Sequence, residues 1–190
     1  MNWINQNKEI LNKLKIISIK NFYKLDYFKK IKIKNIINKN YDLYYCSSGG
    51  FNFPIKNDSS LFFDILYEKF LNTSVDIFGD FKLSFRNSRT CHCYRGNKND
   101  MAVRTSSWWH NHINSSTINS VYYLEVYNDG ITFAKENKEY NYLPKNGELL
   151  IFPSDLIHAA QPNRLQKFRY SVNMEIVTEE STEKLFNRVF

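Results

Sequence analysis

The chain has 190 residues, a formal net charge of +7 and an aromatic content of 16%. This length predicts one domain with a substantial core, and the aromatic content favours a folded, β-rich protein over a disordered one. The sequence contains no run of about 18 uncharged apolar residues, which argues against a membrane-spanning helix. Its polar N-terminus does not resemble a secretory signal, and three cysteines cannot form a complete disulfide framework, so we expect a cytoplasmic protein.

Most of the positive charge lies in the first 40 residues, where ten lysines face only Glu9 and Asp26. Such a segment can attract nucleic acid or another acidic surface. It contains no arginine and no nucleic-acid-reading motif, however. We therefore interpret it as an ordinary solvated region and regard nucleic acid as the less favoured partner.

The first third of the chain predicts a mixture of elements. Apolar residues at helical spacing predict a short amphipathic helix over residues 10–17 and a longer helix over 61–72. Asp58, Ser59 or Ser60 could cap the longer helix. Alternation predicts a half-exposed strand over 30–37, and residues 41–46 resemble a second strand.

The rest of the chain is rich in short β-like runs separated by turn signals such as Asn128-Asp-Gly130. About eight short strands at even spacing predict a mainly β jelly roll, which is a double-stranded β-helix. The predicted strands cover residues 81–85, 90–94, 102–109, 118–126, 131–134, 148–152, 157–161 and 168–177. We expect a single domain with an N-terminal extension and flanking helix over 1–77, a core over 78–178 and a tail over 179–190.

Four residues carry most of the functional information. His110 and His112 are one residue apart, His158 follows a long β-rich segment, and Arg169 comes eleven residues later. Neutral imidazoles can occupy three positions around a transition metal and leave other positions open. An arginine can hold a carboxylate through a two-pronged hydrogen bond. The combination points to iron and an oxo-acid cosubstrate.

In this order the motifs resemble the 2-oxoglutarate/Fe(II)-dependent dioxygenases. That family's pattern is His-x-Asp/Glu, a strand similar to Val-Tyr-Tyr-Leu, then Pro-x-x-Gly-apolar-Phe-Pro-Ser, a distal His and Arg-x-Ser. This chain matches at His110, 121–124, 144–154, His158 and 169–171, within roughly residues 100–177. The resemblance implies a jelly roll that uses Fe(II), 2-oxoglutarate and O2 to hydroxylate an unactivated C–H bond.

The resemblance also implies roles for individual residues. His110, His112 and His158 would be metal ligands, Arg169 would hold the distal carboxylate of 2-oxoglutarate, and Ser171 and Tyr123 would add hydroxyl groups. A structural salt bridge is the alternative for Arg169, and core packing is the alternative for Tyr123.

One departure concerns His112, because the usual second ligand is a carboxylate. A His-x-His version resembles a branch common in phage and bacterial genomes. His112 could be the second ligand or an outer group beside the metal. Without a ligand there, the coordination gap resembles one that accepts halide in another branch, so halogenation stays open as a minor outcome.

A second cluster, Cys91-His92-Cys93, has metal-binding residue types but is too tightly spaced. Neighbouring side chains on a strand point to opposite faces, so His92 would oppose both sulfurs. We expect the two cysteines to be buried on a strand. Arg95, Arg104 and Thr105 could line a substrate entrance, although solvated charges are the simpler interpretation.

Two other function classes share the predicted fold. A cupin-like metalloenzyme could use three histidines without an oxo-acid, and a non-catalytic jelly-roll binding module could carry inert histidines. Fold alone does not separate these classes. The sequence leaves the substrate open between a free amino acid, a peptide side chain, a small metabolite and a nucleotide, and it leaves the oligomeric state open.

Overall fold

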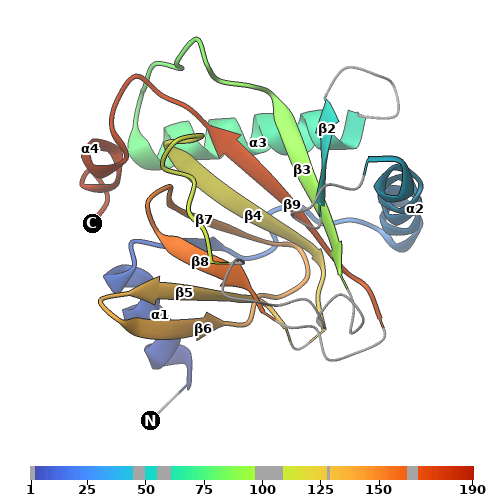
Figure 1. The fold of residues 1–190 in the computed structure, drawn as a ribbon, viewed down its shortest axis with the longest axis horizontal. Helices are drawn as coiled ribbons and strands as arrows, with labels where there is room; N and C mark the ends of the chain where they lie inside the picture. The colour runs from blue at the N-terminus through green and yellow to red at the C-terminus, as the bar shows by residue number, and fades with distance from the viewer. Residues whose placement is uncertain (1–2, 45–49, 55–60, 97–108, 128, 162–166) are drawn as a thin grey trace.

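The computed structural model describes residues 3–44, 50–54, 61–96, 109–127, 129–161 and 167–190. Helices and strands follow one another in the order shown by colour in Figure 1. The elements are α1 (Trp3–Lys13), β1 (Ile17–Ile19), α2 (Tyr27–Tyr44), β2 (Gly50–Pro54), α3 (Leu61–Phe78), β3 (Thr90–Gly96), β4 (Ile118–Glu125), β5 (Ile131–Lys135), β6 (Lys138–Tyr142), β7 (Glu148–Pro153), β8 (Ile157–Ala160), β9 (Arg169–Ile176) and α4 (Thr182–Phe186).

The strands form two antiparallel sheets. The larger sheet has the strand order β1-β7-β4-β9-β3-β2, and the smaller has the order β6-β5-β8. β1 and β2 both precede residue 78, so the extension contributes two strands to the larger sheet. Figure 1 shows the smaller sheet below and beside the larger one. The fold is mainly β, with the jelly-roll architecture that the sequence predicts.

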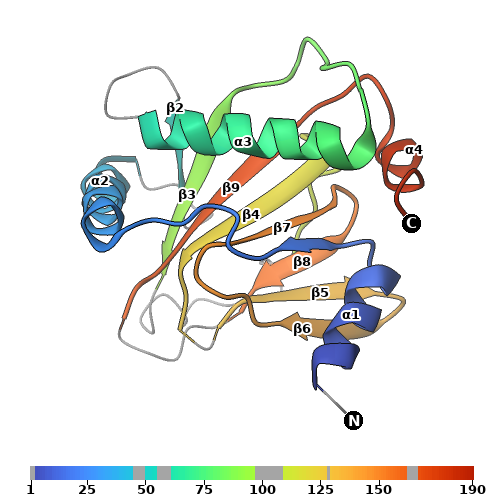
Figure 2. The same cartoon turned by 180° about the vertical axis from the view of Figure 1, so that it is seen from behind.

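The long helix α3 covers the outer face of the larger sheet, as Figure 2 shows. Its buried residues recur at helical spacing, which places one apolar face against the strands. These residues are Phe63, Leu66, Tyr67, Phe70, Ser74 and Phe78. They pack against alternate residues of β3, β4 and β9, including Cys91, Tyr122 and Val172.

The opposite face of the larger sheet packs against the smaller sheet through a second apolar cluster. The larger sheet contributes Tyr123, Leu150 and Phe152 to this cluster, and the smaller sheet contributes Ile131 and Phe133. Because side chains alternate along a strand, neighbours such as Tyr122 and Tyr123 belong to different clusters. The space between the sheets therefore receives every second residue of β4, β7 and β9.

The predicted strand over residues 30–37 is wrong, because these residues lie in the middle of α2. The Asp26 side chain accepts a hydrogen bond from the backbone N–H of Lys29 at 2.8 Å and so caps the helix start. Ile33 and Ile37, one helical turn apart, are the buried residues that dock the helix on the core. The alternation of lysine and isoleucine concealed this helical pair, and tertiary packing decided the outcome.

Other boundaries also differ from expectation. Residues 41–44 belong to α2, so the start of the strand expected over 41–46 is wrong, and 45 and 46 lie outside the described residues. The run 81–85 makes only an isolated bridge, between Leu83 and Thr178. Residues 102–108, and the three candidate cap residues 58–60, also lie outside the described part.

The helix predicted over 61–72 exists and runs on to Phe78. The buried Ser74 hydroxyl donates to the Phe70 carbonyl at 2.9 Å, so it continues the buried face without an unpaired polar group. Gly79 has a φ of 73°, a conformation that suits glycine directly after a helix end.

Several lysines of the first 40 residues are paired within the fold. Lys20 contacts buried Glu148, and Lys34 lies 2.5 Å from a carboxylate oxygen of Glu125.

Within the described ranges, none of the helices is both long and apolar enough to span a bilayer.

Candidate metal centre

Two of the candidate ligands are joined by their backbones. The N–H of His110 donates to the His158 carbonyl at 3.1 Å, and the N–H of His158 donates to the His110 carbonyl at 2.9 Å. This isolated antiparallel bridge brings residue 110 beside β8 in the smaller sheet. Paired residues of an antiparallel bridge project their side chains to the same face, and the two rings lie 4.4 Å apart between centroids.

His112 reaches the same space by a different contact. Its backbone N–H donates to the Ser154 carbonyl at 2.7 Å, and its own carbonyl accepts from the N–H groups of Ser115 and Ser116, each at 2.9 Å. This turn holds the His112 ring 5.0 Å from the ring of His110 and 5.1 Å from that of His158, between centroids.

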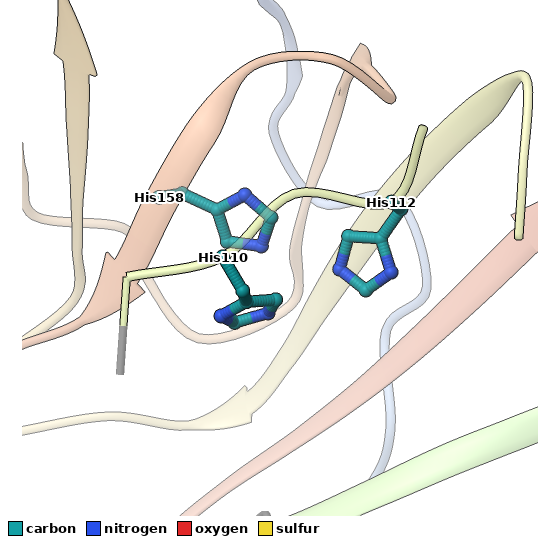
Figure 3. A group of neighbouring side chains, drawn as sticks. All are labelled: His110, His112 and His158. Atoms are coloured by element: carbon teal, nitrogen blue, oxygen red, sulfur yellow. The ribbon is translucent and has the colours of Figure 1, made fainter. Parts of the chain in front are cut away.

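The three predicted ligands therefore form one cluster, shown in Figure 3. One ligand atom from each of His110, His112 and His158 lies within 4.8 Å of the others. Two nitrogens that share a divalent ion at about 2.1 Å each are at most about 4.2 Å apart. Small side-chain rotations would bring the three nitrogens onto one ion, so the residues fit a divalent transition metal.

His158 is held as one neutral tautomer. Its Nδ1 lies 2.9 Å from the Leu156 carbonyl oxygen, which can only accept, so Nδ1 carries the proton and Nε2 carries the lone pair. Burial, and then the neighbouring His110, lower the pKa of His158 to about 3. The ring is therefore neutral near pH 7, as a ligand must be.

His112 has the same arrangement with a carboxylate in place of the carbonyl. Its Nδ1 lies 2.7 Å from Oε1 of Glu175 on β9. Its Nε2 is buried and has no hydrogen-bond partner among the described residues. A buried lone pair without a donor is unfavourable, and a metal ion shared with His110 and His158 would satisfy it.

Arg169, at the start of β9, is buried and bonded. Its Nη1 lies 3.1 Å from Oδ2 of buried Asp129, 3.3 Å from the Gly130 carbonyl and 3.0 Å from the Gln161 carbonyl. The arginine therefore makes a buried ion pair with Asp129, and its hydrogen bonds to described residues all use one of the three guanidinium nitrogens. The guanidinium lies where β8 ends and β5 begins.

Tyr123 and Ser171 lie together beside Arg169. They are direct partners across β4 and β9, and both are buried. Burial raises the pKa of the Tyr123 hydroxyl, while the nearby charge of Arg169 acts in the opposite direction. The structure thus gathers the three predicted cosubstrate residues at one end of the space between the sheets, and the predicted ligands His110, His112 and His158 form their own cluster.

Two residues on the face that carries Arg169 were not predicted as site residues. Glu175 contacts His112, and His92 lies near enough to both for their charges to affect its pKa, which burial mainly lowers. The alternation of Arg169 and Ser171 along β9, extended to residue 175, would have indicated Glu175. The predicted geometry of Cys91-His92-Cys93 is confirmed, because both sulfurs are buried against α3 and His92 opposes them.

Of the three residues proposed to line a substrate entrance, Arg95 lies in the described part of the chain. Arg95 donates to the Asn38 side chain at 3.0 Å and stacks over the Phe168 ring at 4.6 Å, so it is engaged by its neighbours. Arg104 and Thr105 lie outside the described residues.

No protein-family model matches the chain, and no curated protein matches it in sequence. Solved structures do match, and they include prolyl hydroxylases and a 2-oxoglutarate/Fe(II) oxygenase. A prolyl 4-hydroxylase from Phytophthora capsici is 14% identical with a TM-score of 0.62, over 90% of this chain and 61% of that one.

Two further structures match over most of their length. A Trichoplax adhaerens prolyl hydroxylase, in complex with a peptide fragment of the hypoxia inducible factor oxygen degradation domain, is 15% identical with a TM-score of 0.61 and 94% coverage of both chains. HygX from Streptomyces hygroscopicus, with nickel and 2-oxoglutarate bound, is 10% identical with a TM-score of 0.58, over 88% of this chain and 84% of that one. The chain therefore has the jelly-roll fold of the 2-oxoglutarate oxygenases.

Proposed function

We propose that this protein is an Fe(II)- and 2-oxoglutarate-dependent oxygenase that hydroxylates an unactivated C–H bond. The observation that carries the proposal is the cluster of His110, His112 and His158. A buried His112 Nε2 without a partner among the described residues and a neutral His158 are the properties of ligands prepared for a metal. When bound, Fe(II) and 2-oxoglutarate supply the activation of O2, with release of succinate and CO2.

In this proposal Arg169 holds the far end of the cosubstrate. It bonds the carbonyl of Gln161, three residues beyond His158, and three residues of strand span about 10 Å. A five-carbon diacid bound beside His158 would extend toward that end of β8. The distal carboxylate would meet Arg169, with Tyr123 and Ser171 beside it.

Apolar side chains packed between the two sheets would exclude water from the proposed site. Tyr123, Phe133 and Phe152 are buried, and the rings of Phe133 and Phe152 lie 6.2 and 5.0 Å from the His158 ring. These apolar walls lower the local polarity, which strengthens the attraction between Arg169 and an anionic cosubstrate.

For the substrate we propose an amino acid, either free or as a residue of a peptide, that is oxidised on its side chain. The support is the shared fold with prolyl hydroxylases, one of which is bound to a peptide. A small metabolite is the second candidate. Halogenation is disfavoured because His112 lies beside the other two histidines and, as a ligand, would fill the position that an added halide would need.

Anaerobic titration of the protein with Fe(II) and then 2-oxoglutarate tests the proposal. Chelation of the oxo-acid by Fe(II) produces a visible charge-transfer band, which we expect in the native protein. Metal binding without this band would support a three-histidine enzyme that uses no oxo-acid. Absence of metal binding would support a non-catalytic jelly-roll module.

Two variants control the titration. His158→Ala removes a ligand and should lose the band, whereas Glu139→Gln alters an exposed carboxylate on β6 and should keep it. A band that survives in His158→Ala would show that the metal is bound elsewhere.

A further inference from the structure

We propose that Glu175 is a positioning residue that orients His112 toward the metal and supplies negative charge beside it. The inference rests on the metal centre proposed above. In the family pattern that this chain resembles, a carboxylate occupies the position two residues after the first histidine. This chain has His112 there, and a carboxylate from β9, Glu175, contacts that histidine.

The contact between the two side chains is short and directional. Oε1 of Glu175 lies 2.7 Å from Nδ1 of His112, the distance of a charge-assisted hydrogen bond. The two partners are a ring N–H and a carboxylate oxygen, so Nδ1 of His112 donates and Oε1 of Glu175 accepts.

That constraint fixes the tautomer of His112. An Nδ1 that faces an anionic acceptor keeps its proton, so in the neutral ring the lone pair lies on Nε2. This is the buried atom that lacks a partner among the described residues. Figure 3 shows the His112 ring beside those of His110 and His158, and one nitrogen of each ring belongs to the cluster of possible ligand atoms. Removing Glu175 would free the ring to rotate and to exchange its proton between the two nitrogens.

The backbone of Glu175 is held on both sides. The residue pairs with Asn119 of β4, and its carbonyl accepts from the hydroxyl of Tyr67 on α3 at 3.1 Å. Such a fixed origin allows one carboxylate to hold one imidazole in place. Metal-bound histidines usually donate their other nitrogen in this way, and the partner raises the basicity of the ligand.

The charge argument leads to the same residue. Three neutral imidazoles leave the full double charge on a divalent ion, whereas a carboxylate ligand would cancel one unit. Glu175, one imidazole away, partly compensates that charge without occupying a coordination position. The side chain of Glu175 is about 30% exposed, so solvent weakens this effect but does not remove it.

Titration with Co(II) alone tests the proposal by a readout that needs no turnover. Glu175→Ala should weaken Co(II) binding roughly 10- to 100-fold, the usual cost of losing such a partner. Glu175→Gln keeps an oxygen that can accept from Nδ1, so it should lose less. Glu139→Ala removes an exposed carboxylate on β6 and is the matched control, which should bind Co(II) like the native protein. Circular dichroism shows whether each variant is folded.

The double variant His112→Ala/Glu175→Ala separates a positioning role from direct ligation. If Glu175 acts through His112, its removal should have little further effect once His112 is absent. A full further loss would show that Glu175 binds the metal itself and would overturn the proposal. Native affinity in both Glu175 variants would also overturn it, while leaving the metal centre intact. Absence of Co(II) binding in the native protein would instead refute the metal centre.

Discussion

His110 and His158 hydrogen-bond to each other through both backbone N–H and carbonyl groups, although 47 residues separate them in the sequence. Main-chain bonds therefore set the spacing of two proposed ligands, independently of their side chains. A substitution of either imidazole can remove the ligand while the bridge stays in place.

His158→Ala should abolish metal binding and turnover and leave the fold intact. The ring is buried, so its loss creates a small cavity and a destabilisation of roughly 1–3 kcal/mol. Anaerobic Fe(II) titration together with circular dichroism measures both effects. Full activity in protein verified to be free of metal would refute the metal assignment.

Substitution of His112 distinguishes a ligand from an outer group. His112→Ala should weaken metal binding strongly, and His112→Asp should recover part of the affinity by restoring a conventional carboxylate ligand. In the Asp variant, Glu175 would face a second carboxylate across the lost imidazole, so we expect partial recovery only. If both variants keep native iron affinity, the site uses two histidines.

Arg169→Ala should weaken 2-oxoglutarate binding by roughly 2–5 kcal/mol, or about 30- to 5,000-fold. Arg169→Lys keeps the charge without the planar fork and should fall between the native protein and the alanine variant. Iron affinity without cosubstrate should change little in either variant. The measurement is the 2-oxoglutarate dissociation constant at fixed Fe(II) without oxygen. Native affinity in Arg169→Ala would place the anchor elsewhere.

Asp129→Asn should make thermal stability more dependent on the cosubstrate. The ion pair of Asp129 and Arg169 is buried, and loss of one partner of such a pair costs roughly 3–5 kcal/mol. A bound cosubstrate carboxylate would compensate the stranded guanidinium. We therefore expect a lower melting temperature without ligands and a larger rise on adding Fe(II) and 2-oxoglutarate than in the native protein. Equal rises in both proteins would show that the cosubstrate does not meet Arg169.

Glu125→Gln should lower stability at neutral pH but not in acid. Burial alone would raise the pKa of Glu125, but contacts with Lys34, Tyr127 and Lys30 lower it overall. A carboxylate whose folded-state pKa lies below its unfolded value stabilises the fold above the unfolded value, and this contribution disappears as pH falls through the folded value. Denaturant unfolding should give a loss of roughly 0.5–1 kcal/mol at pH 7 that shrinks toward zero in acid. A pH-independent loss would mean that packing, not charge, is responsible.

The sequence predicted the strands around the proposed site, because strands depend on local pattern, and the motif order that resembles a known family predicted the cluster of three histidines. β4, β7, β8 and β9 each appear within a residue or two of their expected bounds. Alternation along β9 correctly put Arg169, Ser171 and Asn173 on one face, since Tyr170 and Val172 pack in the outer cluster.

What the sequence did not predict depends on contacts between distant segments. The sequence indicated Asp129 only as part of a turn. The folded chain shows that its carboxylate pairs with Arg169. The partnership of Glu175 with His112 likewise requires β9 to lie beside the turn after His110. The strand predicted within α2 was wrong because lysine and isoleucine alternate there. In the folded chain, packing of Ile33 and Ile37 against the core outweighs that local pattern and favours a helix.

The position of β1 means that the lysine-rich N-terminal region is not a detachable arm. β1 pairs with β7 from Ile17↔Ile151 to Ile19↔Leu149 and forms the outermost strand on that side of the larger sheet. A protein shortened past β1 would leave the backbone groups of an apolar strand open to pairing with another chain. It would also leave the buried carboxylate of Glu148 without its ion-pair partner Lys20. The exposed edge of β7 would then pair with a second copy of the chain, beside the proposed active site.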